Sequence, residues 1–117
     1  MLARCDSVAP SEFHRRVAAV VGDRAVPAYS GASGLAEISA AGVTKAAALA
    51  SWCTDLGIDQ GEVWAFGDMP NDLPMLAWAG RSYAVANAHP DVLAMADRRC
   101  GSNDDDGVAE VLEQLRR

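Results

Sequence analysis

The segment that most constrains the fold is residues 62–72, which run Glu-Val-Trp-Ala-Phe-Gly-Asp-Met-Pro-Asn-Asp. Residues 63–66 form a short unbroken apolar run, which is typical of a strand buried on both faces of a parallel sheet. The run ends at Gly67, and Pro70 soon afterwards suits the start of a helix. The apolar stripe of that helix begins with Leu73, Leu76 and Ala77. The segment therefore predicts a strand, an acidic turn and a helix.

Three polar residues, Asp68, Asn71 and Asp72, follow directly after the predicted strand. In open α/β sheets, ligands bind at the carboxyl ends of the strands, so these side chains would lie where ligands are usually bound. Each of them could instead cap the following helix, because Asp and Asn are favourable capping residues. Both interpretations remain open from the residues alone.

A second helix is expected after Thr44, which suits its N-cap, and Gly57 would end it. Its expected core-facing residues are Leu49, Trp52, Cys53 and Leu56. Lys45 falls in the first turn, although cations are disfavoured near the positive end of the helix dipole. That end attracts anions such as phosphate, so a lysine there fits a phosphoryl-binding site. The alternative is a solvated lysine on the surface.

The remaining segments predict an alternation of helices and strands. Residues 10–22 predict a helix that Ser11 caps, with Phe13, Val17, Val20 and Val21 on its apolar face and His14, Arg15 and Arg16 on its polar face. Residues 25–30 and 35–40 predict two strands of a hairpin joined by the turn 31–34. Further along, a strand is expected at 82–86 and helices at 90–96 and 104–115. This order indicates an α/β fold with parallel βαβ units.

Composition limits the classes of protein to which the chain can belong. Half of its residues are apolar and 22% are charged, which is typical of a globular domain. Cys5, Cys53 and Cys100 lie far apart, which argues against a disulfide framework or a zinc site. No long apolar run and no basic stripe occur, so we expect a soluble cytoplasmic protein that binds neither membranes nor nucleic acid. With a net charge of -6, a divalent cation is the easier partner to accommodate.

The pattern Gly-Asp-x-x-Asn-Asp at residues 67–72 resembles motif IV of the haloacid dehalogenase superfamily. Glu37-Ile38, followed by Gly42-Val43-Thr44-Lys45, resembles the motif III lysine in the Cof-type, sugar-phosphatase-like branch of that superfamily. The same order continues with Ala79-Gly80, Ala86-Asn87-Ala88, Ala96-Asp97 and Asp106-Gly107-Val108-Ala109. The resemblance covers about residues 35–117. It implies a Rossmann-like parallel sheet with flanking helices, a partial hydrolase core at residues 41–117, and the remnant of an α+β cap domain at residues 1–40.

The resemblance also implies roles for four residues in a Mg²⁺-dependent phosphatase. Lys45 would neutralise the phosphate and the nucleophile, and Asn71 would hydrogen-bond the phosphate. Asp68 would bind Mg²⁺, a hard cation that prefers oxygen ligands. Asp72 would orient Lys45 or the metal-bound water. The implied substrates are small phosphorylated metabolites of the sugar-phosphate type.

The family's nucleophile motif, Asp-x-Asp after an opening strand, does not occur before Lys45. Its only lookalike, at residues 104–106, is interpreted as helix-capping and first-turn acidic residues. We therefore expect the C-terminal part of a phosphatase, truncated or split, that is inactive unless a separate N-terminal fragment supplies the nucleophile. The alternative is a non-catalytic module that dimerises or binds phosphate or metal, because a partial sheet exposes an apolar face and an unpaired edge.

Overall fold

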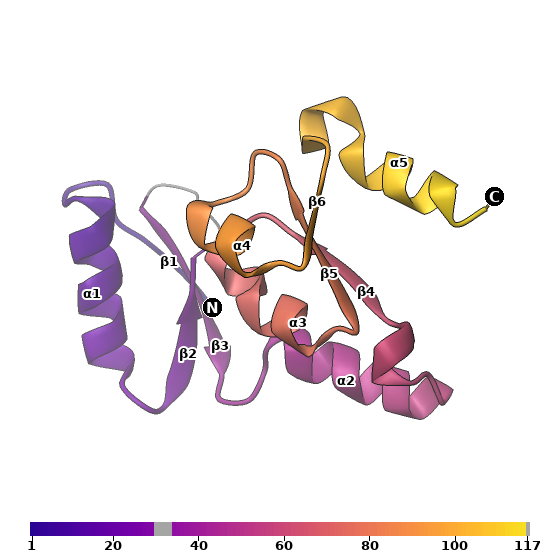
Figure 1. The fold of residues 1–117 in the computed structure, drawn as a ribbon. Helices are drawn as coiled ribbons and strands as arrows, with labels where there is room; N and C mark the ends of the chain where they lie inside the picture. The colour runs from indigo at the N-terminus through magenta and orange to yellow at the C-terminus, as the bar shows by residue number, and fades with distance from the viewer. Residues whose placement is uncertain (30–33, 117) are drawn as a thin grey trace.

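A computed structural model describes residues 1–29 and 34–116 (Figure 1). Its elements, in chain order, are β1 (Leu2–Arg4), α1 (Pro10–Val21), β2 (Ala25–Ala28), β3 (Leu35–Ala40), α2 (Lys45–Leu56), η1 (Gln60–Glu62), β4 (Trp64–Gly67), η2 (Pro70–Asp72), α3 (Leu73–Trp78), β5 (Arg81–Val85), α4 (Pro90–Met95), β6 (Arg98–Cys100), η3 (Asn103–Asp105) and α5 (Gly107–Gln114). The strands form an antiparallel sheet in the order β1-β3-β2 and a parallel sheet in the order β4-β5-β6. The α/β architecture expected from the sequence is confirmed.

The antiparallel sheet contains the predicted hairpin, in which Ala25 pairs with Ala40 and Pro27 with Ile38. Because β2 lies at the edge of this sheet, the missing N–H of Pro27 is tolerated there. The predicted turn at residues 31–34 falls largely outside the described residues. β1, which the sequence did not predict, adds to the other side of β3. Helix α1 packs against β2 and β3 (Figure 1).

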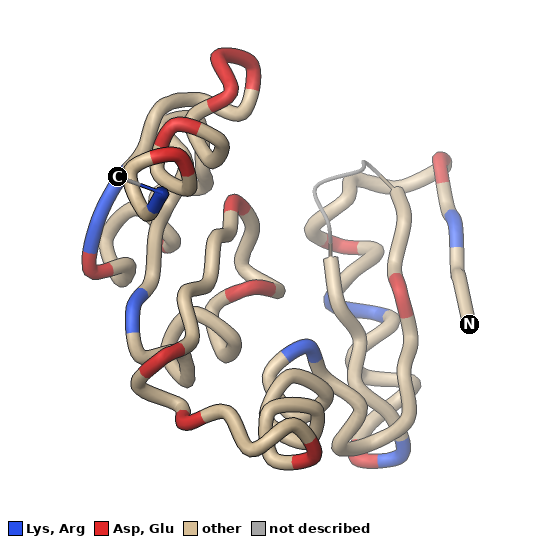
Figure 2. Tube along the Cα trace, turned by 90° about the vertical axis from the view of Figure 1, so that its right-hand side faces the viewer, with Lys and Arg blue, Asp and Glu red and all other residues tan. Residues whose placement is uncertain are grey.

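The parallel sheet contains the strand expected at residues 63–66, now β4, and the strand expected at 82–86, now β5. Gly67 pairs with Ala84, so the two strands end side by side. The core packed on this sheet is small and centred on Leu76 of α3 and Val92 of α4, which are almost fully buried. Figure 2 shows the two sheets on opposite sides of the molecule with α2 between their bases. The parallel sheet and the hairpin therefore lie on either side of α2.

Several helix termini lie where the sequence predicted them. Thr44 caps α2, because its Oγ1 accepts the N–H of Ala47 at 3.1 Å. Gly57 ends the same helix in the left-handed conformation, with φ 69°. The predicted cap at Ser11 is wrong: α1 begins at Pro10, its N-cap position is Ala9, and no side chain caps it. Proline needs no N–H partner at a first helical position, so this start has no polar cost.

The predicted apolar stripes are only partly buried. Trp52 and Leu56 of α2 were expected to face the core, but they are 64% and 58% exposed. In the same way, Val20 is exposed on α1 and Ala77 on α3. Helical spacing identifies side chains that share a face, but it does not determine whether another element covers that face.

The C-terminal region differs most from the expectation. Residues 98–100 form β6, an edge strand parallel to β5, where the sequence indicated no buried strand. The helix expected at 104–115 is divided into η3 and α5, and Asp106 between them adopts φ 57°. Asp104 lies in the first turn of η3 and Asp106 at the N-cap position of α5, as interpreted, but the Asp106 side chain makes no capping hydrogen bond and the cap of η3 is Ser102, whose Oγ accepts the N–H of Asp104. None of the described helices has the length and apolar character needed to span a bilayer.

Candidate active site

Lys45 is positioned by the turn that leads from β3 into α2. Gly42 adopts φ 80° and the N–H of Val43 bonds the carbonyl of Ala40, so the chain reverses direction just before the Thr44 cap. Lys45 is then the first residue of α2, and its Nζ donates a hydrogen bond to Oδ1 of Asp72. This ion pair joins α2 to the turn after β4, across 27 positions of the sequence.

Asp72 is buried at the end of η2, and its side chain is only 5% exposed. Its Oδ2 accepts the backbone N–H of Asp68 at 3.1 Å and that of Met69 at 3.2 Å. A glycine precedes this turn for a steric reason, because a Cβ on Gly67 would lie 2.8 Å from the Asp72 Cβ. The strand end, the turn and the carboxylate therefore form one closely packed unit.

The environment of Asp72 favours its ionised form. Burial alone would raise the pKa of this carboxyl, but the hydrogen bond from Lys45 and those from the N–H groups of Asp68 and Met69 outweigh burial. The net effect places the pKa of Asp72 below its ordinary value. The carboxylate is therefore a fixed negative charge at neutral pH, held from one side by the backbone and from the other by an ammonium group.

Asp68 has a fixed backbone and an unengaged side chain. Its carbonyl accepts the N–H of His89 at 2.7 Å, and its own N–H bonds Asp72. Its carboxylate is exposed and makes no hydrogen bond or ion pair within residues 1–29 and 34–116. In that same part of the chain no three His, Cys, Asp or Glu side chains gather as a metal site. Asp68 thus offers one carboxylate, which suits a cation such as Mg²⁺ that takes few protein ligands and keeps several waters.

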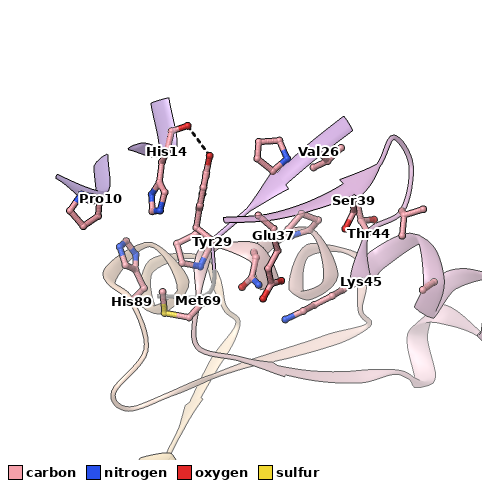
Figure 3. Close-up of a pocket in the computed structure, with 17 residues that line it drawn as sticks. Pro10, His14, Val26, Tyr29, Glu37, Ser39, Thr44, Lys45, Met69 and His89 are labelled. Carbon is pink, nitrogen blue, oxygen red and sulfur yellow. Dashed lines mark hydrogen bonds between the residues drawn. The ribbon is translucent and has the colours of Figure 1, made fainter. Parts of the chain in front are cut away.

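A cavity of about 810 Å³ opens between the antiparallel sheet and the turn after β4 (Figure 3). Lys45 and Asn71 line it, whereas Asp68 and Asp72 do not, although Asp72 accepts the hydrogen bond from Lys45. Asn71 Oδ1 is buried and has no hydrogen-bond partner among the described residues. A buried polar atom without a partner is costly, so Asn71 is a candidate to bind a ligand in this cavity.

The geometry separates the two interpretations of the acidic turn. Asp68 and Asn71 form no side-chain cap on the described helices, so the capping alternative is not supported for them. Asp72 does bond the N–H groups at the start of η2, as a capping residue would, and it also binds Lys45. Of the predicted residues, Lys45 and Asn71 therefore line the cavity, Asp72 binds Lys45, and the backbone of Asp68 binds Asp72.

A sequence model of haloacid dehalogenase-like hydrolases matches residues 6–112 of this chain. The chain belongs to this family. The family assignment expected from the sequence, including the Cof-type branch, is thereby confirmed.

The family's curated and solved members support this assignment. A 5-amino-6-(5-phospho-D-ribitylamino)uracil phosphatase of Escherichia coli is 40% identical over 95 residues, which are 81% of this chain and 35% of that protein. A haloacid dehalogenase-like hydrolase of Bacillus subtilis superposes with a TM-score of 0.85 at 28% identity, over 97% of this chain and 39% of that one. A subclass IIB sugar phosphatase of the superfamily gives 0.80 at 26% identity, over 91% and 40% of the two chains. The chain thus spans well under half the length of these relatives, of which two are named phosphatases.

The structure adds cavity residues that the sequence analysis of this haloacid dehalogenase-like chain did not identify. His89 caps α4, because its Nδ1 accepts the N–H of Asp91 at 3.2 Å, and it also lines the cavity. His14 was expected on the surface, yet its ring stacks on Tyr29 with 3.7 Å between centroids and faces the same space. Helical spacing could not reveal this, because the contact depends on how α1 packs on β2.

Proposed function

We propose that this chain is the C-terminal part of a Mg²⁺-dependent phosphatase that acts on small phosphorylated metabolites of the sugar-phosphate type. The observation on which the proposal rests is the ion pair between Lys45 and the buried Asp72, at the edge of an open cavity and at the carboxyl end of β4. Phosphoryl transfer asks a protein chiefly for positioned charges, and this arrangement provides them. The phosphatase names of the relatives point in the same direction.

In the proposed site the phosphate binds between Lys45 and Asn71. The ammonium group neutralises phosphate charge, and the N-terminus of the twelve-residue helix α2 adds to the positive potential. The Nδ2 group of Asn71 can donate a hydrogen bond to a phosphate oxygen, whereas its buried Oδ1 is an acceptor and would pair with a donor such as a ligand hydroxyl group. Asp72 keeps Lys45 directed toward the cavity, because its own position is fixed by two backbone N–H groups.

Asp68 is the residue that we assign to Mg²⁺. Its carboxylate is unengaged, exposed and located at the carboxyl end of a parallel strand, which fits a cation that also binds phosphate oxygens and water. When bound, the ion would supply further neutralisation of the phosphate. The part played by Asp68 itself is to hold that charge beside Lys45 while its backbone stays fixed by His89 and Asp72.

The nucleophile is proposed to come from a separate N-terminal segment. In the lookalike, Asp104 lies within η3 and Asp106 directly follows it, and neither residue lines the cavity. Within the described residues β4 pairs with β5 alone, so its other edge is free to receive a strand. A strand added there would end beside Asp68, at the edge where the parallel strands of this sheet terminate.

Lys45 is the sole lysine of the sequence, which permits a direct test of the site. Protein prepared with ¹³C-labelled lysine should give one side-chain methylene signal next to Nζ. Inorganic phosphate should shift that signal saturably, and Mg²⁺ should tighten the binding. Lys45→Ala should abolish phosphate binding measured by calorimetry, whereas Arg98→Ala, an exposed charge on β6, should leave it unchanged. A signal that does not move with phosphate would contradict the proposed site.

The rate of phosphate ester hydrolysis provides a second test of the proposal. The purified chain should show no Mg²⁺-dependent hydrolysis of p-nitrophenyl phosphate, because the family's Asp-x-Asp motif does not precede Lys45 and the lookalike residues Asp104 and Asp106 do not line the cavity. Robust hydrolysis that Asp68→Ala abolishes would show that the chain is catalytically competent by itself, and the claim of a separate nucleophile would then be wrong.

A non-catalytic module that dimerises is the second candidate function. It is favoured by the apolar outer face of α2, where Trp52 and Leu56 are largely exposed, together with the free edge of β4. Exposed aromatic and aliphatic groups of this size commonly mark association surfaces. The two candidates are compatible, because association through α2 would leave the cavity between the two sheets open.

A further inference from the structure

Among the described residues, two side-chain polar atoms are buried without a hydrogen-bond partner. They are His14 Nε2 and Asn71 Oδ1. Both residues line the same cavity, one from α1 and the other from the turn after β4. Leaving such an atom unpaired costs about 1–3 kcal/mol of stability. The wall of this one cavity therefore contains two costly unpaired atoms, which come from different elements. Asn71 belongs to the phosphate site proposed above, but His14 has no role there.

The His14 ring is held in place and cannot readily find a partner elsewhere. It stacks on the Tyr29 ring at 3.7 Å with an interplanar angle of 25°. The Tyr29 hydroxyl in turn donates to the backbone carbonyl of His14 at 2.9 Å, which ties β2 and its following loop to α1. A preorganised ring in a cavity wall, with a buried nitrogen that has no partner among the described residues, is arranged like a recognition group, because little ordering entropy remains to be lost on binding.

Figure 3 shows His14, Tyr29 and His89 toward one end of the cavity, and Thr44 and Lys45 toward the other. A ligand whose phosphate lies at Lys45 would therefore extend its organic part toward His14. The surfaces near that end include Pro10 and the thioether of Met69, so they are largely apolar. A carbon skeleton with attached hydroxyl groups suits this combination of an aromatic wall with the imidazole groups of His14 and His89.

We propose that His14 is a specificity-determining residue whose Nε2 hydrogen-bonds a hydroxyl group on the organic part of the phosphorylated ligand. A hydroxyl both donates and accepts, so it pairs with this nitrogen in either tautomer of the neutral imidazole. The inference rests on the proposed function, since it places the phosphate at Lys45. The hydrogen bond from His14, which lies on α1, would make the site select hydroxylated phosphate esters over plain alkyl phosphate esters.

Calorimetric titration of the full chain with two probes tests this selection. The probes are D-ribose 5-phosphate and n-butyl phosphate, which share the phosphate and differ in hydroxyl groups. The wild type should bind the ribose ester more tightly. His14→Phe keeps a ring to stack on Tyr29 but removes the nitrogen, so affinity for ribose 5-phosphate should fall about 5- to 10-fold, the equivalent of one net hydrogen bond. Affinity for butyl phosphate should not change.

His14→Gln provides a matched variant, because its amide can reach a position close to that of Nε2. It should retain much of the preference for the ribose ester, which a purely structural role of the ring would not explain. Equal binding of the two probes by the wild type would overturn the inference. So would a loss of the same size for both probes in His14→Phe, because the whole cavity would then have changed.

Inorganic phosphate separates this inference from the proposal on which it rests. If phosphate binding does not depend on Lys45, the proposed phosphate site is wrong and the role of His14 falls with it. If phosphate binding requires Lys45 but His14→Phe leaves the preference for ribose 5-phosphate intact, only the role of His14 is overturned.

Discussion

The Asp72 carboxylate is expected to stabilise the fold through two kinds of hydrogen bond that mutation can separate. Asp72→Asn keeps the shape of the side chain and one oxygen, which can still accept the N–H groups of Asp68 and Met69. It loses the charged bond to Lys45, whose side chain is 52% exposed, so solvent screening reduces the loss to about 1–2 kcal/mol. Asp72→Ala also leaves both N–H groups unpaired, which adds about 2 kcal/mol.

Urea unfolding followed by tryptophan fluorescence at pH 7 measures these free energies of unfolding. The expected order of destabilisation is Asp72→Ala, then Asp72→Asn, then the control Asp55→Asn on the exposed face of α2, which should lie within about 0.5 kcal/mol of wild type. If Asp72→Ala and Asp72→Asn were equally stable, the two backbone hydrogen bonds would contribute nothing, and the account of the turn would be refuted.

The pH dependence of the same variants tests the charge of Asp72. Because the pKa of this group is lowered in the folded protein, its stabilisation is fully present above the unfolded pKa of about 3.9 and is lost as the pH falls through the folded pKa. The gap in free energy between wild type and Asp72→Asn should therefore be constant from about pH 5 to 8 and should narrow below about pH 4. A gap that stays the same at pH 3 would mean that the carboxylate charge is not what Lys45 stabilises.

Two further predictions concern packing. Gly67→Ala should lower the free energy of unfolding, measured with urea, by about 1–3 kcal/mol, because the added Cβ would lie 2.8 Å from Asp72 Cβ and 3.0 Å from Leu76 Cδ1. An unchanged free energy of unfolding would show that the turn can move. Size-exclusion chromatography at low micromolar concentration should give a dimer or larger species, and Trp52→Glu should shift it toward monomer, because a charge would enter the exposed apolar face of α2. A stable wild-type monomer would contradict this association.

The features that the sequence predicted well are those determined locally. The apolar run before Gly67 predicted β4, and Thr44 and Gly57 predicted both ends of α2. Polar residues that follow a buried strand must lie at its carboxyl end, so the location of Asp68 followed from the strand alone. The contact between Lys45 and Asp72 could not be predicted in that way, because it depends on how α2 docks beside β4; the family resemblance implied it, and the structure has it.

The features that the sequence did not predict depend on contacts between distant elements. β6 consists of two arginines and a cysteine, a composition that predicts no strand, and it forms because the free edge of β5 is there to pair with. Trp52 shares a helical face with Cys53 only approximately, and whether that face is covered depends on neighbours outside α2. His14 was assigned to a polar helix face by periodicity alone, and its stack on Tyr29 arises only when α1 packs against the hairpin.

The different exposure of Lys45 and Asp72 indicates how the proposed site would respond to a phosphate. The Asp72 carboxylate is buried and held by two backbone N–H groups, so it stays in place whether or not Lys45 contacts it. The Lys45 side chain is half exposed at the cavity, so its ammonium group can bridge to an incoming anion without breaking the turn. Asp72 would thus remain ionised and keep the ammonium near the phosphate, because moving Lys45 away would leave a buried carboxylate with less compensation. The rigid member of the pair therefore positions the mobile one, which is the arrangement that charge neutralisation during phosphoryl transfer requires.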